Sequence, residues 1–129
     1  MTTGYAKIAL TGDYGISWLL TRLAGTARAR ELMFLSERID ARRCEALGLV
    51  NRVVPDADLQ SEAFGIARTL ANGPASAYAS IKDNLDLALS ADFLTSLDQE
   101  AEKMVVAAGT AQHAEAVRAF IEKRAPNYR

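Results

Sequence analysis

Several residue types are scarce in this chain of 129 residues, and each scarcity excludes a kind of protein or site. The single cysteine, Cys44, cannot form a disulfide within the chain, which argues against a disulfide-rich secreted domain and suits the reducing cytoplasm. With a single histidine as well, His113, the chain shows no clustered ligand spacing of the kind that binds metals. We therefore expect a cytoplasmic protein without a metal site.

Neither charge nor hydrophobicity is concentrated in one part of the chain. The 15 basic and 16 acidic residues give a formal net charge of −1, so electrostatics do not favour nucleic acid or an anionic membrane as a partner. No segment reaches the roughly 18 consecutive apolar residues of a membrane helix, and the N-terminus lacks the apolar stretch of a signal peptide. The composition, 50% hydrophobic and 24% charged, is that of one ordinary globular domain.

The spacing of apolar residues predicts a chain made mainly of helices. Gly25 is expected to stop the first helix, and Asp40 is expected to cap a short helix that ends at Gly48. The expected helices cover residues 16–24, 26–36, 41–47, 57–72, 75–90, 92–108 and 111–124.

One or two short strands are also expected. Residues 5–10 could be a strand or an extended entry segment, and residues 49–54 (LVNRVV) are rich in β-branched residues between Gly48 and Pro55. A strand at 49–54 needs a partner strand, because unpaired backbone groups at a buried edge are costly. Since the rest of the chain is expected to be helical, that partner should come from another part of the fold or from a second chain.

Asp13 lies in the turn TGDYG (11–15), directly before the first expected helix, and it has two interpretations. In the first, its carboxylate is the N-cap, which accepts a hydrogen bond from a backbone N–H near residues 15–16 and favours the helix dipole. In the second, it is a general acid or base in a turn at the edge of a pocket. Spacing alone favours the capping role.

Four other side chains could have either a structural or a functional role, and the structural role is the simpler one. Cys44 is expected to be a small buried apolar residue on the face of Leu47 rather than a nucleophile. His113 is expected to be a solvated surface histidine. Phe120 and Lys123, three positions apart on one expected helix face, could hold an adenine ring and a phosphate, although an apolar anchor beside a solvated charge is simpler.

Four blocks, read in order, resemble the second half of the crotonase (enoyl-CoA hydratase/isomerase) family. The second block carries the pattern A-x-E-L…I-x-A…GLVN-x-VVP, with Cys44 where the family often has alanine, and the fourth carries A-F-x-E-K-R-x-P. Lys82, in the third block, is similar to a lysine that the family carries in that helix. The resemblance covers essentially the whole chain, through residues 7–25, 27–55, 73–85 and 116–129.

The resemblance implies a fold as well as a family. Members of the family stack β-β-α units into a spiral, and their C-terminal helices form trimers that often pair into hexamers. The chain is therefore expected to be a single partial domain over residues 1–129, the C-terminal helical part of this fold. Residues 1–55 would be the end of the spiral core, and residues 56–129 would be a helical trimerisation region.

The same resemblance implies chemistry on acyl-CoA thioesters in fatty-acid metabolism, with coenzyme A as part of the substrate and no separate cofactor. The oxyanion-hole N–H groups and the first catalytic carboxylate belong to the family's N-terminal half, which the four blocks do not include. Tyr5 stands where a hydratase carries its second glutamate, and Asp13 where some isomerases carry a catalytic aspartate. Phe120 and Lys123 match positions that contact coenzyme A in a neighbouring subunit.

Three hypotheses remain open at this point. The chain could pair with a separately encoded N-terminal half and complete an acyl-CoA isomerase or hydratase. It could be a non-catalytic oligomerisation or binding module, as a homo-trimer or hexamer, or a degenerate fragment without a selected role. Met1 directly before TTGYAK suggests a reading frame that begins within the fold, as in a split or truncated gene.

Overall fold

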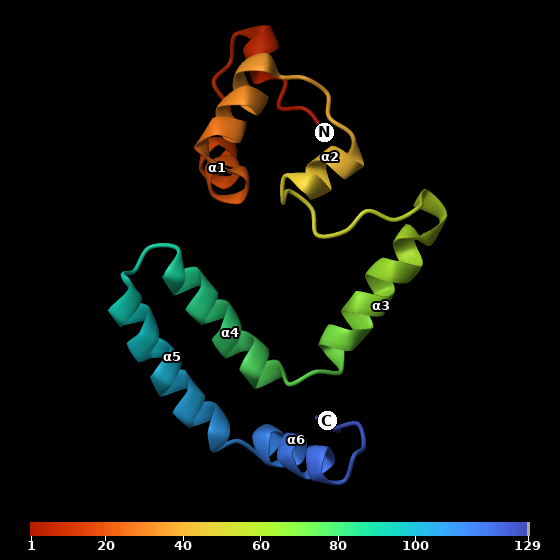
Figure 1. Cartoon of the computed structure of the whole chain (residues 1–129), viewed down its shortest axis with the longest axis vertical. Helices are drawn as coiled ribbons and strands as arrows, with labels where there is room; N and C mark the ends of the chain where they lie inside the picture. The colour runs from red at the N-terminus through yellow and green to blue at the C-terminus, as the bar shows by residue number, and fades with distance from the viewer. Residues whose placement is uncertain (129) are drawn as a thin grey trace. The chain divides into compact units, whose positions relative to one another are not determined.

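The computed structural model describes residues 1–128, and most of them are helical (Figure 1). In chain order the elements are η1 (Tyr5–Ile8), α1 (Ile16–Leu35), α2 (Ala41–Ala46), η2 (Asp56–Asp58), α3 (Leu59–Ala71), α4 (Ala75–Ala88), α5 (Phe93–Ala108) and α6 (Ala111–Ile121). These elements form two compact units, one over Met1–Asp58 and the other from Leu59 onward. The expectation of a mainly helical chain is confirmed.

The two expected strands do not form, and no β-strand occurs within residues 1–128. Residues 5–8 are instead a turn of 3₁₀-helix, bounded by Gly4 and Ala9 in the left-handed conformation (φ 71° and 55°). Residues 49–54 lack a partner strand, and the Val53 N–H donates to the Glu45 carboxylate at 3.0 Å instead of to a neighbouring strand. A segment rich in β-branched residues does not form a strand when no neighbouring strand is present to hydrogen-bond with it.

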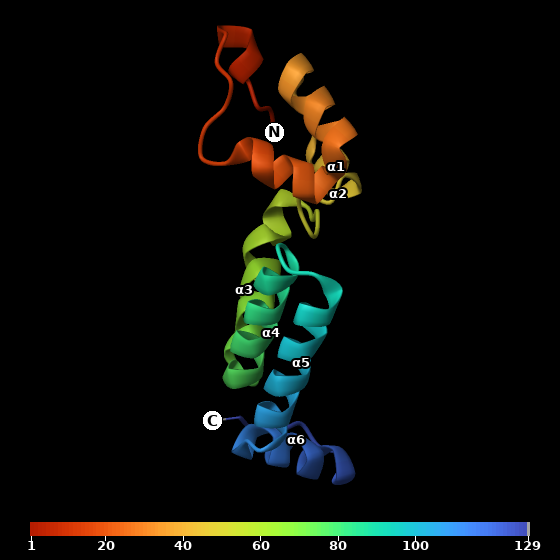
Figure 2. The same cartoon turned by 90° about the vertical axis from the view of Figure 1, so that its left-hand side faces the viewer.

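The first unit is organised around α1, which bends where the sequence predicts a break. Gly25 has φ 77° and ψ 161°, so α1 consists of two straight segments that meet at an angle (Figure 2). Leu20 from the first segment and Ala29 and Leu32 from the second form the buried core. Partly buried side chains that pack against this core are Ile16, Met33, Ile39, Leu47 and Leu49.

The N-terminal residues are attached to the end of α1. The Met1 amine donates to the Ile39 carbonyl at 2.7 Å, and the Ile39 N–H donates back to the Met1 carbonyl at 2.8 Å. Thr2 Oγ1 donates to the Ser36 carbonyl at 2.9 Å, and Thr3 Oγ1 donates to the Leu32 carbonyl at 2.8 Å. Because Ser36 is completely buried, these hydrogen bonds anchor the segment that leads into η1.

Helix α2 begins and ends where the sequence predicts. The Asp40 carboxylate accepts a hydrogen bond from the Arg43 N–H at 2.7 Å, which is the expected N-cap. Gly48 follows the helix with φ 71°, and the Leu49 N–H donates to the Cys44 carbonyl at 2.9 Å, as in a Schellman motif. Cys44 is buried, with 5% of its surface exposed, so its assignment as a small buried residue is confirmed.

In the second unit, α4 and α5 form an antiparallel hairpin and α6 follows against the end of α5 (Figures 1 and 2). An ion pair between Lys103 and Asp83 joins the two helices of the hairpin. Ser76 Oγ at the start of α4 donates to the Gln112 side chain of α6 at 2.6 Å. Polar side-chain contacts thus connect α4 to both α5 and α6.

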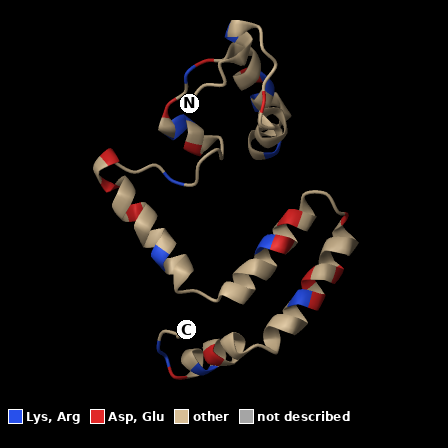
Figure 3. Ribbon diagram, turned by 180° about the vertical axis from the view of Figure 1, so that it is seen from behind, with Lys and Arg blue, Asp and Glu red and all other residues tan. Residues whose placement is uncertain are grey.

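The helices of the second unit leave their apolar sides uncovered. Ala119 is the one fully buried residue of residues 59–128. Lys and Arg lie beside Asp and Glu along α4 and α5, with long uncharged stretches between them (Figure 3). Within the described part of the chain no helix is long and apolar enough to cross a membrane. The exposed large apolar residues are Leu59, Phe64, Ile66, Leu70, Ile81, Leu85, Leu89, Phe93, Leu94, Leu97, Met104, Val105, Val106, Val117, Phe120 and Ile121.

Candidate functional site

The loop that carries Asp13 turns sharply before α1. Gly12, Tyr14 and Gly15 have φ of 119°, 48° and 74°. A Cβ atom on Gly12 would lie 2.9 Å from Ile16 Cγ2 and 3.2 Å from Met33 Cε, so the loop packs closely against α1 at this point. The close approach and the positive φ together require glycine at this position.

Asp13 is not the N-cap of α1, so the capping hypothesis is wrong. The cap position is Gly15, which has no side-chain hydrogen bond, and the Asp13 carbonyl accepts from the Ile16 N–H at 3.0 Å. An N-cap side chain comes from an extended residue immediately before the helix. Two left-handed residues, Tyr14 and Gly15, separate Asp13 from the first helical residue, Ile16, and the exposed Asp13 carboxylate has another partner.

That partner is Tyr5, eight residues earlier in the chain. The Tyr5 hydroxyl donates to Asp13 Oδ1. The hydrogen bond to the Asp13 carboxylate raises the pKa of Tyr5 above its ordinary value, because ionised phenolate would lose the bond and repel the carboxylate. Sequence reasoning names both residues separately and misses their contact, since no periodic spacing connects positions 5 and 13.

A concavity of about 410 Å³ lies in the same unit, between the loop and the two segments of α1. Thr11, two residues before Asp13, belongs to its wall together with the Arg30 guanidinium. The remaining wall residues are Ser17, Thr21, Thr26, Ala29, Met33 and Phe34. The wall of the concavity therefore combines hydroxyl groups, one cationic residue and apolar side chains.

Phe120 and Lys123 do not share a helix face, because α6 ends at Ile121. Lys123 has φ 54°, its N–H donates to the Phe120 carbonyl at 3.2 Å, and the Arg124 N–H donates to the Ala119 carbonyl at 3.0 Å. These two bonds make a Schellman motif with lysine at the left-handed position that usually holds glycine. Both side chains are exposed, Phe120 to 85%.

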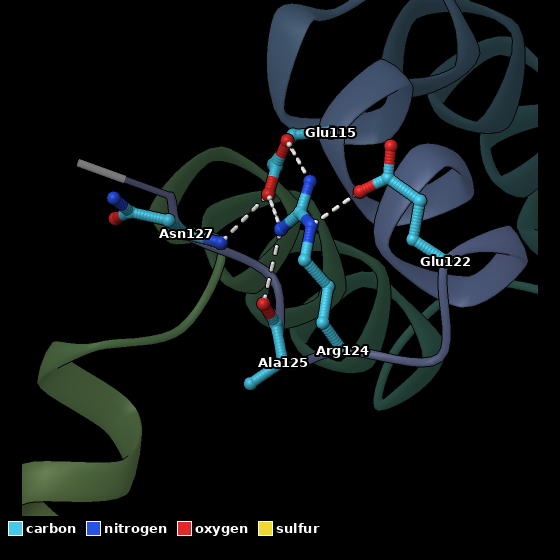
Figure 4. A network of polar contacts seen from close by, with 5 residues as sticks. All are labelled: Glu115, Glu122, Arg124, Ala125 and Asn127. Carbon is cyan, nitrogen blue, oxygen red and sulfur yellow. Dashed lines mark hydrogen bonds and ion pairs between the residues drawn. The ribbon is translucent and has the colours of Figure 1, made fainter.

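A network around Arg124 fixes the segment after α6 (Figure 4). The guanidinium binds the Glu115 carboxylate through both Nη atoms, at 2.6 and 3.1 Å, and Nε binds Glu122 at 2.5 Å. The Asn127 N–H also donates to Glu115, at 2.9 Å. Hydrogen bonds from Arg124 and Asn127 lower the pKa of Glu115 to about 2, and those from Arg124 to the two glutamates raise its own pKa.

The remaining candidate from the sequence is His113. His113 is exposed on α6, and its assignment as a surface histidine is confirmed. Among residues 1–128 no group of three or more His, Cys, Asp or Glu side chains is arranged to hold a metal ion.

The fold of the described residues matches one half of several solved enzymes. An enoyl-CoA hydratase from Polaromonas sp. JS666 matches with a TM-score of 0.93 and 37% identity, covering 99% of this chain and 50% of that one. The helical architecture is therefore that of part of a crotonase-fold protein.

Sequence comparison defines the family. A family model described as enoyl-CoA hydratase/isomerase matches residues 2–129. The chain belongs to the enoyl-CoA hydratase/isomerase family. A 1,2-epoxyphenylacetyl-CoA isomerase from Escherichia coli is 35% identical over 96% of this chain and 47% of its own length. A probable enoyl-CoA hydratase from Rhodobacter capsulatus is 34% identical over 96% of this chain and 48% of its own length. The chain thus spans about half the length of these curated relatives.

Proposed function

We propose that this chain supplies the proton-transfer half of an acyl-CoA isomerase, with Asp13 as the group that moves the proton. The observation that carries the proposal is the exposed Asp13 carboxylate, held at Oδ1 by Tyr5 in a loop packed against α1. Tyr5 is the one side chain within residues 1–128 that bonds to this carboxylate. Oδ2 is then the oxygen that faces a substrate.

The reaction that this arrangement supports is the movement of a double bond in an acyl-CoA thioester. Asp13 Oδ2 takes a proton from a carbon of the acyl chain, and the electron pair of that C–H bond moves onto the thioester carbonyl oxygen as an enolate. Two backbone N–H groups from the N-terminal half stabilise this oxygen, each worth about 3–4 kcal/mol. When the carbonyl re-forms, Asp13 returns the same proton to a second carbon, so no atom is gained or lost.

An isomerase fits the residues of this loop better than a hydratase does. Hydration requires groups that activate a water molecule and protonate carbon, commonly two carboxylates in this family. Position 5 holds a tyrosine whose pKa is raised by Asp13, so its hydroxyl is a poor proton acceptor at neutral pH. One carboxylate suffices for carrying a proton between two carbons.

The second unit would serve binding and assembly in this proposal. Residues 56–129 would form a homo-trimer, or a hexamer of two trimers, through the exposed apolar sides of α3, α4, α5 and α6. Phe120 and Lys123 would contact the coenzyme A of a neighbouring subunit, with the ring against adenine and the ammonium group near a phosphate. Coenzyme A is part of the substrate here, and the assembly would act in the cytoplasm.

In this proposal the oxyanion hole and the first catalytic carboxylate come from an N-terminal half of the family fold, such as a separately encoded chain. The test joins the N-terminal half of the Polaromonas enoyl-CoA hydratase to residues 1–129 and measures two reactions. We expect isomerisation of a β,γ-unsaturated acyl-CoA and little hydration of crotonyl-CoA. A fusion that assembles, hydrates crotonyl-CoA and does not isomerise would contradict the proposal.

Residues 1–129 by themselves should be inactive as a hydratase, because the resemblance places the oxyanion-hole donors in the half of the family fold that these residues do not match. We expect no measurable hydration of crotonyl-CoA by the purified chain. Turnover in the ordinary enzyme range of about 1–10³ per second, lost on substitution of a residue within this chain, would show that the site is complete without a partner.

A non-catalytic oligomerisation module is the second candidate, and the second unit favours it. Its helices expose large apolar side chains along their length while burying only Ala119. Apolar surface of this extent is typical of an interface rather than of a monomer's exterior. A stable homo-oligomer whose fusion with an N-terminal half has no activity on any acyl-CoA would select this function over the isomerase.

A further inference from the structure

We infer that Tyr5 is a positioning residue for Asp13, whose hydroxyl holds Oδ1 and so leaves Oδ2 as the one oxygen that carries the proton. The inference rests on the proposed function, because it assigns a task to Tyr5 within that same site. Its basis is the hydrogen bond from the Tyr5 hydroxyl to Asp13 Oδ1.

The backbone brings the two residues together through repeated left-handed turns. Gly4 and Ala9 flank η1 in this conformation, and the Leu10 N–H donates to the Tyr5 carbonyl at 3.0 Å, which closes the turn. Tyr14, directly after Asp13, is also left-handed, with φ 48°. Non-glycine residues persist in this conformation only where the surrounding structure holds them. The Tyr5–Asp13 contact is therefore made by a loop of defined shape.

Both ends of the loop are fixed to the same helix. On the Tyr5 side, Thr3 Oγ1 donates to the Leu32 carbonyl at 2.8 Å. On the Asp13 side, Gly12 lies against Ile16 and Met33. Leu32 belongs to the buried core, and Ile16 and Met33 pack on it, so α1 is a common scaffold for both partners.

The hydrogen bond makes the two oxygens of the Asp13 carboxylate unequal. An exposed aspartate without a partner rotates about its side-chain bonds and presents either oxygen in many directions. A carboxylate bound at Oδ1 presents Oδ2 in one direction, which raises the fraction of molecules that are aligned for proton transfer. The Asp13 carboxylate raises the pKa of Tyr5, so the phenol keeps its proton and remains a donor at neutral pH.

The first arm of the test uses the chain alone and follows ionisation of its four tyrosines by absorbance and by NMR of ¹³Cζ-labelled tyrosine. We expect the Tyr5 hydroxyl to titrate above the ordinary value, its signal to disappear in Tyr5→Phe, and its pKa to return toward the ordinary range in Asp13→Ala, which removes the acceptor. Tyr14→Phe, at the neighbouring exposed position, is the matched control and should keep the raised titration. If Tyr5 titrates in the ordinary range in the wild-type chain, the contact is absent and the inference fails.

The second arm uses the fusion that completes the active site. Tyr5→Phe should lower kcat by up to about 100-fold while KM stays unchanged, because alignment is lost and substrate binding is not. Tyr14→Phe should change neither constant. An unchanged kcat in Tyr5→Phe, with activity still abolished by Asp13→Asn, would overturn the role of Tyr5 and leave the proposed function standing. Activity that survives Asp13→Asn would overturn both.

Discussion

The two units of this chain differ in how they bury their apolar side chains. The first unit has a core built from Leu20, Ala29 and Leu32, and its N-terminal residues are hydrogen-bonded to the end of α1. The second unit has well-defined helices, yet Ala119 is its one buried residue among those described. Its helices are joined by polar contacts such as Ser76–Gln112 and Lys103–Asp83.

This difference separates two sources of structure. Local signals, such as caps and breaks, are sufficient to define where a helix begins and ends. A stable tertiary arrangement requires that the apolar side of each helix be covered. The first unit meets this requirement in part by itself, whereas the helices of the second unit leave large apolar side chains exposed.

The largest effect should come from the core of the first unit. Leu32→Ala should lower its free energy of unfolding by about 2–5 kcal/mol, because truncation leaves a cavity beside Leu20 and Ala29. Leu35→Ala, on the same helix but 57% exposed, is the matched control and should cost far less. Urea unfolding followed by fluorescence of Trp18, the single tryptophan, reports on this unit. Equal losses in the two variants would show that the first unit has no core.

A smaller pair of effects compares the ends of α2 and α6. Gly48 and Lys123 both follow a helix in the left-handed conformation, with φ of 71° and 54°. Gly48→Ala should destabilise the first unit by about 1 kcal/mol, whereas Lys123→Gly should stabilise α6 by up to about 1 kcal/mol. Thermal unfolding by circular dichroism measures both changes. If Lys123→Gly destabilises the protein, the lysine side chain stabilises the folded state by more than its left-handed backbone conformation destabilises it.

The N-cap of α6 in the second unit should have an effect of similar size on the free energy of unfolding. Thr110 Oγ1 accepts from the His113 N–H at 3.1 Å at the start of α6. Thr110→Ala should cost about 1 kcal/mol, and Thr110→Ser should restore nearly all of it, since serine is an equally good cap. The measurement is thermal unfolding of the purified chain. A loss in the serine variant as large as in the alanine variant would assign the effect to the missing methyl group.

The smallest effect concerns the segment after α6 and depends on pH. The pKa of Glu115 is lowered from 4.5 to about 2, so its bonds to Arg124 contribute stability above pH 4.5 that is lost as the pH falls toward 2. Because the Asn127 N–H donates to Glu115, its NMR signal should shift with a midpoint near 2. Glu122→Gln should leave that midpoint low. A midpoint near 4.5 would show that the network does not form in solution.

The local features that the sequence predicts correctly are those encoded by single residues. Gly25 breaks α1, Asp40 caps α2 and Gly48 ends it, because each acts through its own backbone or a neighbouring N–H. The prediction of a strand at residues 49–54 is wrong for a physical reason. Its β-branched residues favour a ladder, and residues 1–128 contain no strand that could pair with it.

The candidate site was harder to predict, because its contacts depend on unusual backbone conformations. Tyr14 and Lys123 are left-handed although neither is glycine, and no pattern in the sequence indicates this. The left-handed Tyr14 keeps Asp13 away from the capping position. The left-handed Lys123 lies beyond the end of α6, so it does not share a helix face with Phe120. Family resemblance places these residues at functional positions, and the roles of Asp13, Phe120 and Lys123 stay predictions.

The most direct test of the account is the isomerisation rate of the fusion after a single substitution in the first unit. Asp13→Asn keeps the size of the side chain and its ability to accept the Tyr5 hydrogen bond, but it cannot take a proton. We expect isomerisation to fall by at least about 100-fold while the sedimentation of the fusion stays unchanged. An Asp13→Asn fusion that assembles and isomerises at the wild-type rate would contradict the account.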